Sequence, residues 1–537
     1  MLLRLRLLLA FLVVAVAQGA ARTGALLPAS SSALADRVAA RHAKAVTPRD
    51  SSVGRSGSSG SMQTALVAAS VLRQRGADRL EAFLSKYGGA ACIAGGILSH
   101  IVFGTLYCWS NFQSYSPPSL RFFDGLDHKG SSPDAMLVFP LTLVAQCFAM
   151  PFGTIVAKQL GPRAAMLLGC TIVSVGVLLA SYATTLSAFI FFYSIVFGTG
   201  VGLGYTAAMI AGWKWMPNSK GLVSGSILAG FGSGGFFFNL IGTKLVNPNG
   251  LNPVKGVFPQ EVYDNFPKML RTLACIYMTM GLFGALFISE PPVPTGDLES
   301  SSSISSSKRK DSSSSSSSLL PTSSPSGGAG TAVAAELPGV SVQDALRTPQ
   351  FWLIWTMIVS SASAGLNVAS VYKQFASASP ALHGDSFQAL VGGLGALSNG
   401  VGRIFWGTLC DKIGFKQSFA LLTLIQALVH AYYPSTANSK SAFAFFTCLC
   451  YFFLAGNFAL MPPSIQRLFG PRNGSLIYGI VYSAFGTASI AALFMNKSLT
   501  ASLGFEGVFR ILSVFSIVAT VLASQLTPVK AFAGSSL

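Results

Sequence analysis

One apolar stretch carries a permanent charge in its middle: Leu390-Val-Gly-Gly-Leu-Gly-Ala-Leu-Ser-Asn-Gly-Val-Gly-Arg-Ile-Phe-Trp-Gly-Thr-Leu409, with Arg403 as the charge. An arginine at bilayer depth costs at least about 2.5 kcal/mol, so chains keep one mainly where it faces a protein interior or a water-filled path. Arg403 lies about 13 Å along a helix from the basic helix end at Lys412. The stretch therefore predicts a membrane-spanning helix whose arginine binds an anion. The alternative is an arginine that pairs with backbone carbonyls or extends to the membrane surface.

The composition places the whole chain in a membrane. Of its 537 residues, 51% are hydrophobic and 10% are charged, against about 25% charged in soluble domains. Apolar runs near 20 residues recur, each long enough to cross about 30 Å of hydrocarbon. They are continuous rather than alternating, which favours an all-α membrane protein over a β-barrel. The twelve predicted spans are Ala90–Phe112, Ala135–Val156, Ala164–Thr184, Ser187–Ala211, Leu222–Leu245, Leu270–Ile288, Phe351–Phe375, Phe387–Cys410, Ser418–Tyr433, Ser441–Pro463, Gly474–Asn496 and Gly507–Leu526.

The net charge of +18 is distributed by side of the membrane and does not indicate nucleic-acid binding. Basic residues are concentrated in alternate short loops, which the positive-inside rule places on the cytosolic side together with the long central linker. Those residues are Lys158, Arg163, Lys214, Lys220, Lys412, Lys416, Arg467 and Arg472. We expect the protein to lie in a lipid bilayer and to function as a monomer.

The chain begins with segments that are typical of targeting rather than of a fold. Residues 1–20 combine a basic start, a short apolar core and small residues near Ala20, as in a signal peptide. Residues 21–86 are rich in Ala, Ser and Arg and poor in acids, as in a transit peptide. Together they predict a two-part leader for a plastid membrane of secondary origin. The alternative is a simple signal peptide ahead of a disordered tail, with the plasma membrane as the location.

The other domain boundaries follow from the alternation of apolar and polar segments along the sequence. Two six-helix halves, 87–290 and 346–528, flank a linker at 291–345 that contains the serine tract Ser300–Ser326 and cannot bury a core. A short tail occupies 529–537. The eight cysteines lie in or beside apolar spans without metal-ligand spacing, so we expect small core residues, no disulfide framework, no metal and no cofactor.

Equivalent places in the two halves carry a related basic turn. Gly153-Thr-Ile-Val-Ala-Lys-Gln-Leu-Gly-Pro-Arg163 follows the second span, and Gly407-Thr-Leu-Cys-Asp-Lys-Ile-Gly-Phe-Lys416 follows the eighth. This pair resembles the loop motif of the major facilitator superfamily. The resemblance implies a gating role for Gly407, Asp411, Lys412 and Gly414. The first half departs from the pattern, because Ala157 stands where an acid is usual.

Further stretches resemble the oxalate–formate antiporter group of that superfamily, which is related to the monocarboxylate transporters. They cover the bundle from Ala90 to Leu526. The matching segments are Gly104-Thr-Leu-Tyr-Cys-Trp-Ser110, Gly200-Val-Gly-Leu-Gly-Tyr205, Trp215–Gly232, Leu346-Arg-Thr-Pro-Gln-Phe-Trp352, Asn399–Gly407 and Tyr478–Ser489. The resemblance implies the major facilitator fold and the activity of a secondary transporter.

The resemblance also assigns a substrate site. It implies that Arg403 binds a substrate carboxylate, which agrees with the argument from its burial, because a guanidinium matches a carboxylate in two parallel hydrogen bonds. The second cation of the oxalate antiporter is replaced here by Phe485. One cation neutralises one carboxylate, and a second carboxylate would remain uncompensated. A monocarboxylate of the pyruvate, lactate or formate type is therefore favoured, with an oxalate or dicarboxylate exchanger as the alternative.

Aromatic residues complete the expected site. The positions that the resemblance assigns to the substrate cavity are Tyr107, Tyr205, Phe231, Phe458 and Tyr482. Apolar rings exclude water and strengthen the attraction between Arg403 and a carboxylate, and a tyrosine hydroxyl can donate a hydrogen bond to the anion. For each ring taken alone, ordinary helix packing is the competing interpretation.

His100 lies outside the family pattern. It shares one helix face with Gly104, Tyr107 and Asn111. Histidine titrates near neutral pH and could carry a proton in symport. A neutral imidazole that is hydrogen-bonded inside the bundle is the competing interpretation. These two interpretations of His100 leave three modes of transport open: symport with a proton, exchange and facilitated diffusion.

Four classes of function can be compared on these observations. A carrier for small organic anions explains Arg403, the aromatic positions and the half-repeat. A channel would need more polar residues along the spans. An enzyme is not predicted, because the sequence shows no metal cluster, nucleophile motif or carboxylate pair. A non-transporting receptor with the same fold is the remaining alternative.

Overall fold

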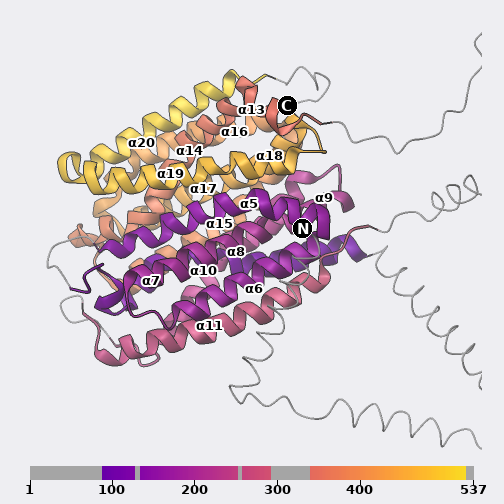
Figure 1. The fold of residues 1–537 in the computed structure, drawn as a ribbon. Helices are drawn as coiled ribbons and strands as arrows, with labels where there is room; N and C mark the ends of the chain where they lie inside the picture. The colour runs from indigo at the N-terminus through magenta and orange to yellow at the C-terminus, as the bar shows by residue number, and fades with distance from the viewer. Residues whose placement is uncertain (1–86, 127–132, 252–256, 292–338, 528–537) are drawn as a thin grey trace, which may run out of the picture. The chain divides into compact units, whose positions relative to one another are not determined.

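A computed structural model describes residues 87–126, 133–251, 257–291 and 339–527. These segments form a bundle of long helices that pack side by side (Figure 1). The predicted two-part leader, most of the linker and the tail lie outside the described residues. Within the bundle, each long apolar run of the sequence forms a helix, because a helix satisfies every backbone hydrogen bond within its own segment.

The first half begins with the helix Tyr87–Tyr115, whose middle tightens into the 3-10 segment η1 (Gly104–Cys108) before it ends as α4 (Trp109–Tyr115). The next helices are continuous or broken by short irregular segments. They are η2 (Pro118–Leu120), η3 (Asp134–Leu137), α5 (Val138–Leu160), α6 (Pro162–Ala180), α7 (Leu186–Ile190), the π-helical η4 (Phe191–Val196), α8 (Phe197–Tyr205), α9 (Ala207–Trp215), α10 (Lys220–Val246) and α11 (Gln260–Phe287).

The second half repeats this pattern. Its elements are α13 (Val342–Arg347), α14 (Pro349–Ser377), η5 (Pro380–Leu382), α15 (Asp385–Ile413), α16 (Phe415–Tyr432), η6 (Tyr433–Asn438), α17 (Lys440–Phe469), α18 (Gly474–Val481), α19 (Ser483–Phe494), the π-helical η7 (Met495–Leu499) and α20 (Thr500–Ser524). The basic turns after α5 and α15 each end on a glycine with positive φ, Gly161 at 88° and Gly414 at 84°. This equivalence supports the half-repeat that the sequence indicates.

The predicted all-α fold with twelve spans is confirmed. Nine helices of the described part are long and apolar enough to cross a membrane. The last of these, Gly474–Ser524, contains two predicted spans, because Gly504 at φ 65° breaks it. The two remaining spans are α15, which carries the polar Asn399 and Arg403, and α16, which has 18 residues.

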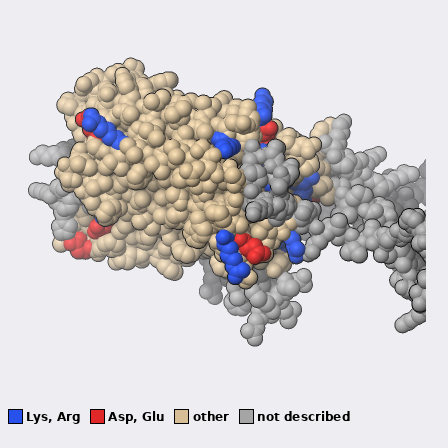
Figure 2. Space-filling view, turned by 90° about the horizontal axis from the view of Figure 1, so that it is seen from above, with Lys and Arg blue, Asp and Glu red and all other residues tan. Residues whose placement is uncertain are grey.

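Charge is segregated on the bundle surface. On the face seen in Figure 2, a broad uncharged band separates the charged side chains near its two ends. Large apolar side chains such as Phe148, Leu428 and Phe494 are exposed on the helices. This distribution suits a bundle whose middle faces lipid.

Glycines allow close helix contact both within the first half and between the halves. A β-carbon on Gly104 would lie 2.0 Å from the backbone oxygen of Phe231 in α10. Between the halves, a β-carbon on Gly407 of α15 would lie 2.3 Å from the backbone oxygen of Gly221. Small residues at such crossings are the usual means by which membrane helices approach each other.

Candidate functional site

Arg403 is fully buried on α15 near the interface between the halves. Its Nε donates a hydrogen bond to Oδ1 of Asn399 at 3.0 Å, and its Nη2 donates to the hydroxyl of Tyr107 at 3.4 Å. Its Nη1 makes no hydrogen bond to any residue that the structure describes. Among the described residues, no acidic side chain forms an ion pair with it. A buried cation without a counter-ion is costly, so this site is suited to binding an anion.

Asn399 lies on the same helix as Arg403 and accepts a hydrogen bond from its guanidinium. The Asn399 amide donates to the backbone oxygen of Tyr451 in α17 at 2.9 Å, which fixes the direction of Oδ1 towards Arg403. Trp406, three residues after Arg403 on the same helix, points to α17, where its Nε1 donates a hydrogen bond to the backbone oxygen of Phe452 at 3.1 Å. Asn399 therefore orients Arg403, and Trp406 anchors the helix.

Two aromatic rings pack against the guanidinium. The guanidinium carbon lies 5.0 Å from the ring centre of Phe231 and 4.7 Å from that of Phe458. Both distances are within the range of cation–π attraction. These rings come from α10 and α17, so both halves contribute to the surroundings of the charge.

The other predicted aromatic residues continue this cluster. Phe485 stacks on Phe458 at 4.3 Å, and Tyr482 lies 4.8 Å from Phe485. Tyr205 lies 5.2 Å from Tyr482 and 5.5 Å from Phe231. The structure thus brings together Arg403 and all six aromatic residues that the sequence analysis named, although they lie on six helical segments.

Two further polar residues belong to this cluster and were not among the predicted site residues. Gln146 of α5 donates to the hydroxyl of Tyr482 at 3.0 Å, and its Oε1 has no hydrogen bond. The ring of Tyr478 lies 5.8 Å from that of Tyr482. The buried hydroxyls of Tyr478 and Tyr205 lie near each other, but neither forms a hydrogen bond of good geometry with a described residue. The spacing of four residues between Tyr478 and Tyr482 is the signal that could have found Tyr478.

His100 lies at the edge of the cluster and is fully buried. Its Nδ1 lies 2.8 Å from the backbone oxygen of Gly96, and its Nε2 lies 3.1 Å from the backbone oxygen of Tyr205. Its ring packs on Phe103, Tyr205 and Phe231. The imidazole therefore shares two aromatic neighbours, Tyr205 and Phe231, with the arginine site.

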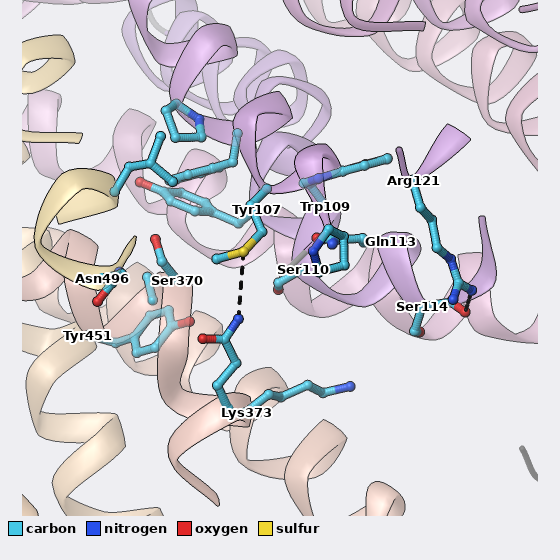
Figure 3. A pocket seen from close by; sticks show the side chains of 17 residues that line it. Tyr107, Trp109, Ser110, Gln113, Ser114, Arg121, Ser370, Lys373, Tyr451 and Asn496 are labelled. Carbon is cyan, nitrogen blue, oxygen red and sulfur yellow. Dashed lines mark hydrogen bonds between the residues drawn. The ribbon is translucent and has the colours of Figure 1, made fainter. Parts of the chain in front are cut away.

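A pocket of about 320 Å³ leads towards this cluster from one end of the bundle. Residues of both halves line it, including Tyr107 from the first half and Tyr451 from the second (Figure 3). Arg121 and Lys373 are the charged residues of its described lining. Since Tyr107 contacts both the pocket and Arg403, the tyrosine ring separates the buried charge from the pocket.

The halves are joined at the opposite end by Asp411. Its carboxylate accepts hydrogen bonds from the backbone amides of Gly221 at 3.1 Å and Leu222 at 2.8 Å, at the start of α10. Arg467 forms an ion pair with the same carboxylate at 2.7 Å. A carboxylate at a helix N-terminus is favourable because the free amides and the helix dipole are positive there. The other predicted gating residues are Gly407, which allows the close crossing, Gly414, which ends α15, and the exposed Lys412.

The first half makes a different contact at this end. Ala157 replaces the acid, and the neighbouring Lys158 donates to the backbone oxygen of Arg472 in the second half. Lys220 also reaches across to Oε1 of Gln466 at 3.4 Å. These contacts join the two halves at the end of the bundle that carries the basic loops, while the pocket lies towards the other end.

Comparisons with known proteins agree with this architecture. The family model described as Major Facilitator Superfamily matches residues 364–534. Apicoplast pyruvate carrier 1 of Toxoplasma gondii is 25% identical over 484 residues, covering 80% of this chain and 87% of the carrier. The oxalate:formate antiporter of Oxalobacter formigenes is 26% identical over 446 residues, covering 80% and 90%.

Solved structures show the same fold at lower identity. The Escherichia coli fucose:proton symporter FucP matches with a TM-score of 0.56 and 13% identity, covering 81% of this chain and 97% of the symporter. The proton:xylose symporter XylE matches with a TM-score of 0.58 and 12% identity, covering 83% and 97%.

Two six-helix halves with a charged site between them define a secondary transporter rather than an enzyme. The chain is related to transporters of the major facilitator superfamily, among them apicoplast pyruvate carriers, the oxalate:formate antiporter and monocarboxylate transporters. The family resemblance that the sequence indicates is confirmed. The protein is an integral, multi-pass membrane protein.

Proposed function

We propose that this protein carries a small monocarboxylate of the pyruvate, lactate or formate type across a membrane. The observation that supports this most directly is Arg403, a fully buried cation with a free Nη1 and no acidic partner among the described residues. A carboxylate would complete its hydrogen bonds and neutralise its charge. The neighbouring hydroxyls of Tyr107, Tyr205 and Tyr478 supply further donors.

The surroundings of Arg403 favour one carboxylate over two. Phe485, at the position of the antiporter's second cation, is fully buried and stacks on Phe458. A dicarboxylate would bring a second negative charge against these rings, and burying an unpaired charge is costly. An oxalate or dicarboxylate exchanger is the second candidate, supported by the likeness to the oxalate:formate antiporter.

Transport follows from movement of the halves about the site. In the structure, the Asp411 contacts close one end, and the pocket approaches Tyr107 from the other. An anion that binds Arg403 reduces the cost of enclosing this charge between the halves. Rocking of the halves then exposes the site to the cytosolic side, as in alternating access.

We further propose a plastid membrane of secondary origin as the location. The composition that predicts a two-part leader supports it, as does the likeness to an apicoplast carrier. The plasma membrane is the alternative. The functional unit is a monomer, because both halves that form the site belong to one chain.

Uptake into liposomes tests the proposal. Purified protein is reconstituted and supplied with labelled pyruvate, lactate, formate or oxalate at two pH values, with protein-free liposomes as the control. We expect uptake of at least one monocarboxylate to exceed that of oxalate. Faster uptake of oxalate would favour the exchanger, and binding of pyruvate without any uptake would favour the receptor.

A further inference from the structure

His100 lies on the first helix, at the point where this helix packs against the break between α8 and α9. Tyr205 is the last residue of α8, one residue before the turn at Thr206 that separates α8 from α9. The carbonyl of Tyr205 faces Nε2 of His100, while Nδ1 faces the carbonyl of Gly96 in the histidine's own helix. The imidazole thus links the first helix to the break between α8 and α9.

Both ring nitrogens face atoms that can only accept hydrogen bonds. A neutral imidazole has one N–H, so either tautomer leaves a nitrogen lone pair directed at a carbonyl oxygen. The imidazolium form has two N–H groups and donates to both carbonyls. The positions of the two carbonyls therefore suit a proton on each nitrogen.

His430 provides an internal comparison. It is also fully buried, and its Nδ1 lies 2.8 Å from the backbone oxygen of Gln426, four residues earlier. Its Nε2 makes no hydrogen bond. A neutral imidazole satisfies this arrangement, since one N–H suffices. The backbone of Ala364 also lies near this imidazole but forms no hydrogen bond of good geometry with Nε2, whereas the Tyr205 carbonyl lies 3.1 Å from Nε2 of His100.

The charges around His100 limit when it can hold a second proton. The charged group that acts on it is Arg403 of α15, and the titratable side chain in contact with its ring is Tyr205 of α8. Phe103 and Phe231 form apolar walls. An imidazolium beside Arg403 would place two positive charges in a buried site, and among the described residues no acidic side chain pairs with either. A substrate carboxylate balances the second charge.

We infer that His100 carries the coupled proton, so that one proton and one monocarboxylate cross together. This inference rests on the proposed function and specifies its coupling ion. A proton from water forms the second N–H bond of His100 as the anion binds, and it returns to water when the anion leaves. The anion and the proton stabilise each other reciprocally. Because one negative and one positive charge move, transport is electroneutral.

The experiment compares His100→Gln with the matched variant His430→Gln in liposomes. A glutamine amide can donate to both carbonyls but cannot take up a proton. With the outside one pH unit more acidic, we expect wild type and His430→Gln to accumulate pyruvate up to about tenfold, the ratio set by one coupled proton. We expect His100→Gln to lose this accumulation but to retain exchange of labelled for unlabelled pyruvate at equal pH.

A second measurement, of binding, applies even to a variant that no longer transports pyruvate. Pyruvate is added to purified protein in weakly buffered detergent, and proton uptake is followed with an indicator dye. We expect uptake by wild type and His430→Gln and none by His100→Gln. Unchanged proton uptake or accumulation by His100→Gln overturns the inference, as does wild-type transport without proton movement. If wild type neither binds nor moves any monocarboxylate, the proposed function itself fails.

Discussion

Nη2 of Arg403 lies 3.4 Å from the hydroxyl oxygen of Tyr107, and this contact joins the two halves at the inner wall of the pocket. The tyrosine is partly exposed to the pocket, whereas the arginine is fully buried. An anion that approaches through the pocket therefore meets Tyr107 before it reaches the charge. We regard this tyrosine as the first contact of the substrate and as part of the barrier above it.

Replacing Tyr107 with Phe should weaken binding without removing the site. The ring would still fill the space, but the hydroxyl donor would be lost, and hydrogen bonds to charged groups contribute about 1.5–3 kcal/mol. We expect KM for pyruvate uptake to rise about tenfold or more. Tyr432→Phe, at an exposed tyrosine of α16, is the control. An unchanged KM for Tyr107→Phe would show that the hydroxyl does not meet the substrate.

Removing the cation should abolish transport. Arg403→Ala takes away the charge and should reduce uptake to the protein-free level, whereas Arg403→Lys keeps a point charge without the planar fork and should retain weak uptake. Arg510→Ala is the control, because Arg510 is exposed and its ion pair in the described part of the chain is with a neighbour on its own helix, Glu506. Normal uptake by Arg403→Ala would reject the site assignment.

A second cation should change selectivity. Phe485→Lys would place an ammonium next to Phe458 and near Arg403, which could balance a second carboxylate. We expect the ratio of oxalate to pyruvate uptake to rise by at least about tenfold, the effect of about 1.4 kcal/mol. Phe485→Met, which keeps the position apolar, should retain the wild-type preference. The assignment of Phe485 to the substrate site would be lost if the lysine variant folds and shows an unchanged ratio.

Neutralising Asp411 should loosen the closed end. Asp411→Asn removes the ion pair with Arg467 and weakens the bonds to the α10 amides. Cys410 is buried beside this contact and can report its opening by alkylation with a membrane-permeant maleimide. The background variant has Cys275 and Cys448 replaced by Ser, since these two are not buried. We expect faster labelling in Asp411→Asn and no change in Lys412→Gln; equal rates would argue against a gate at Asp411.

Crowding the contact between the first helix and α10 should lower stability. A methyl group on Gly104 would lie 2.0 Å from the backbone oxygen of Phe231, so the helices must separate. Overpacking of this kind costs about 1–3 kcal/mol, and we expect a lower melting temperature for Gly104→Ala. In Gly235→Ala the nearest atom lies at 3.3 Å, so its melting temperature should change less. Equal changes would show that the close crossing contributes little.

Most of the fold could be predicted because hydropathy follows directly from the requirement to span a bilayer. The positions of the breaks inside the spans could not be predicted. The turn at Thr206 and the π-helical segment Phe191–Val196 both lie inside the predicted span Ser187–Ala211, where the sequence is continuously apolar, whereas the kink at Gly504 falls in the predicted connection between the last two spans. Local backbone geometry there depends on packing against neighbouring helices.

The residues of the candidate site also divide into those that could be predicted from the sequence and those that could not. Arg403 stands out in the sequence because a charge in an apolar run is rare, and the aromatic positions followed from the family resemblance. Tyr478 and the role of Asn399 did not, because one tyrosine or asparagine in a helix resembles any other until its neighbours are known. The proximity of His100 to the carbonyl of Tyr205 joins residues 105 positions apart and carries no sequence signal.

The sequence by itself determined that the chain forms apolar spans in two halves around one buried cation, since hydrophobicity and charge are properties of each residue alone. Only the tertiary structure decided which rings surround that cation, which end of the bundle is closed, and where His100 finds its two acceptors. These depend on helix crossings and rotations, which arise from contacts between residues far apart in the chain.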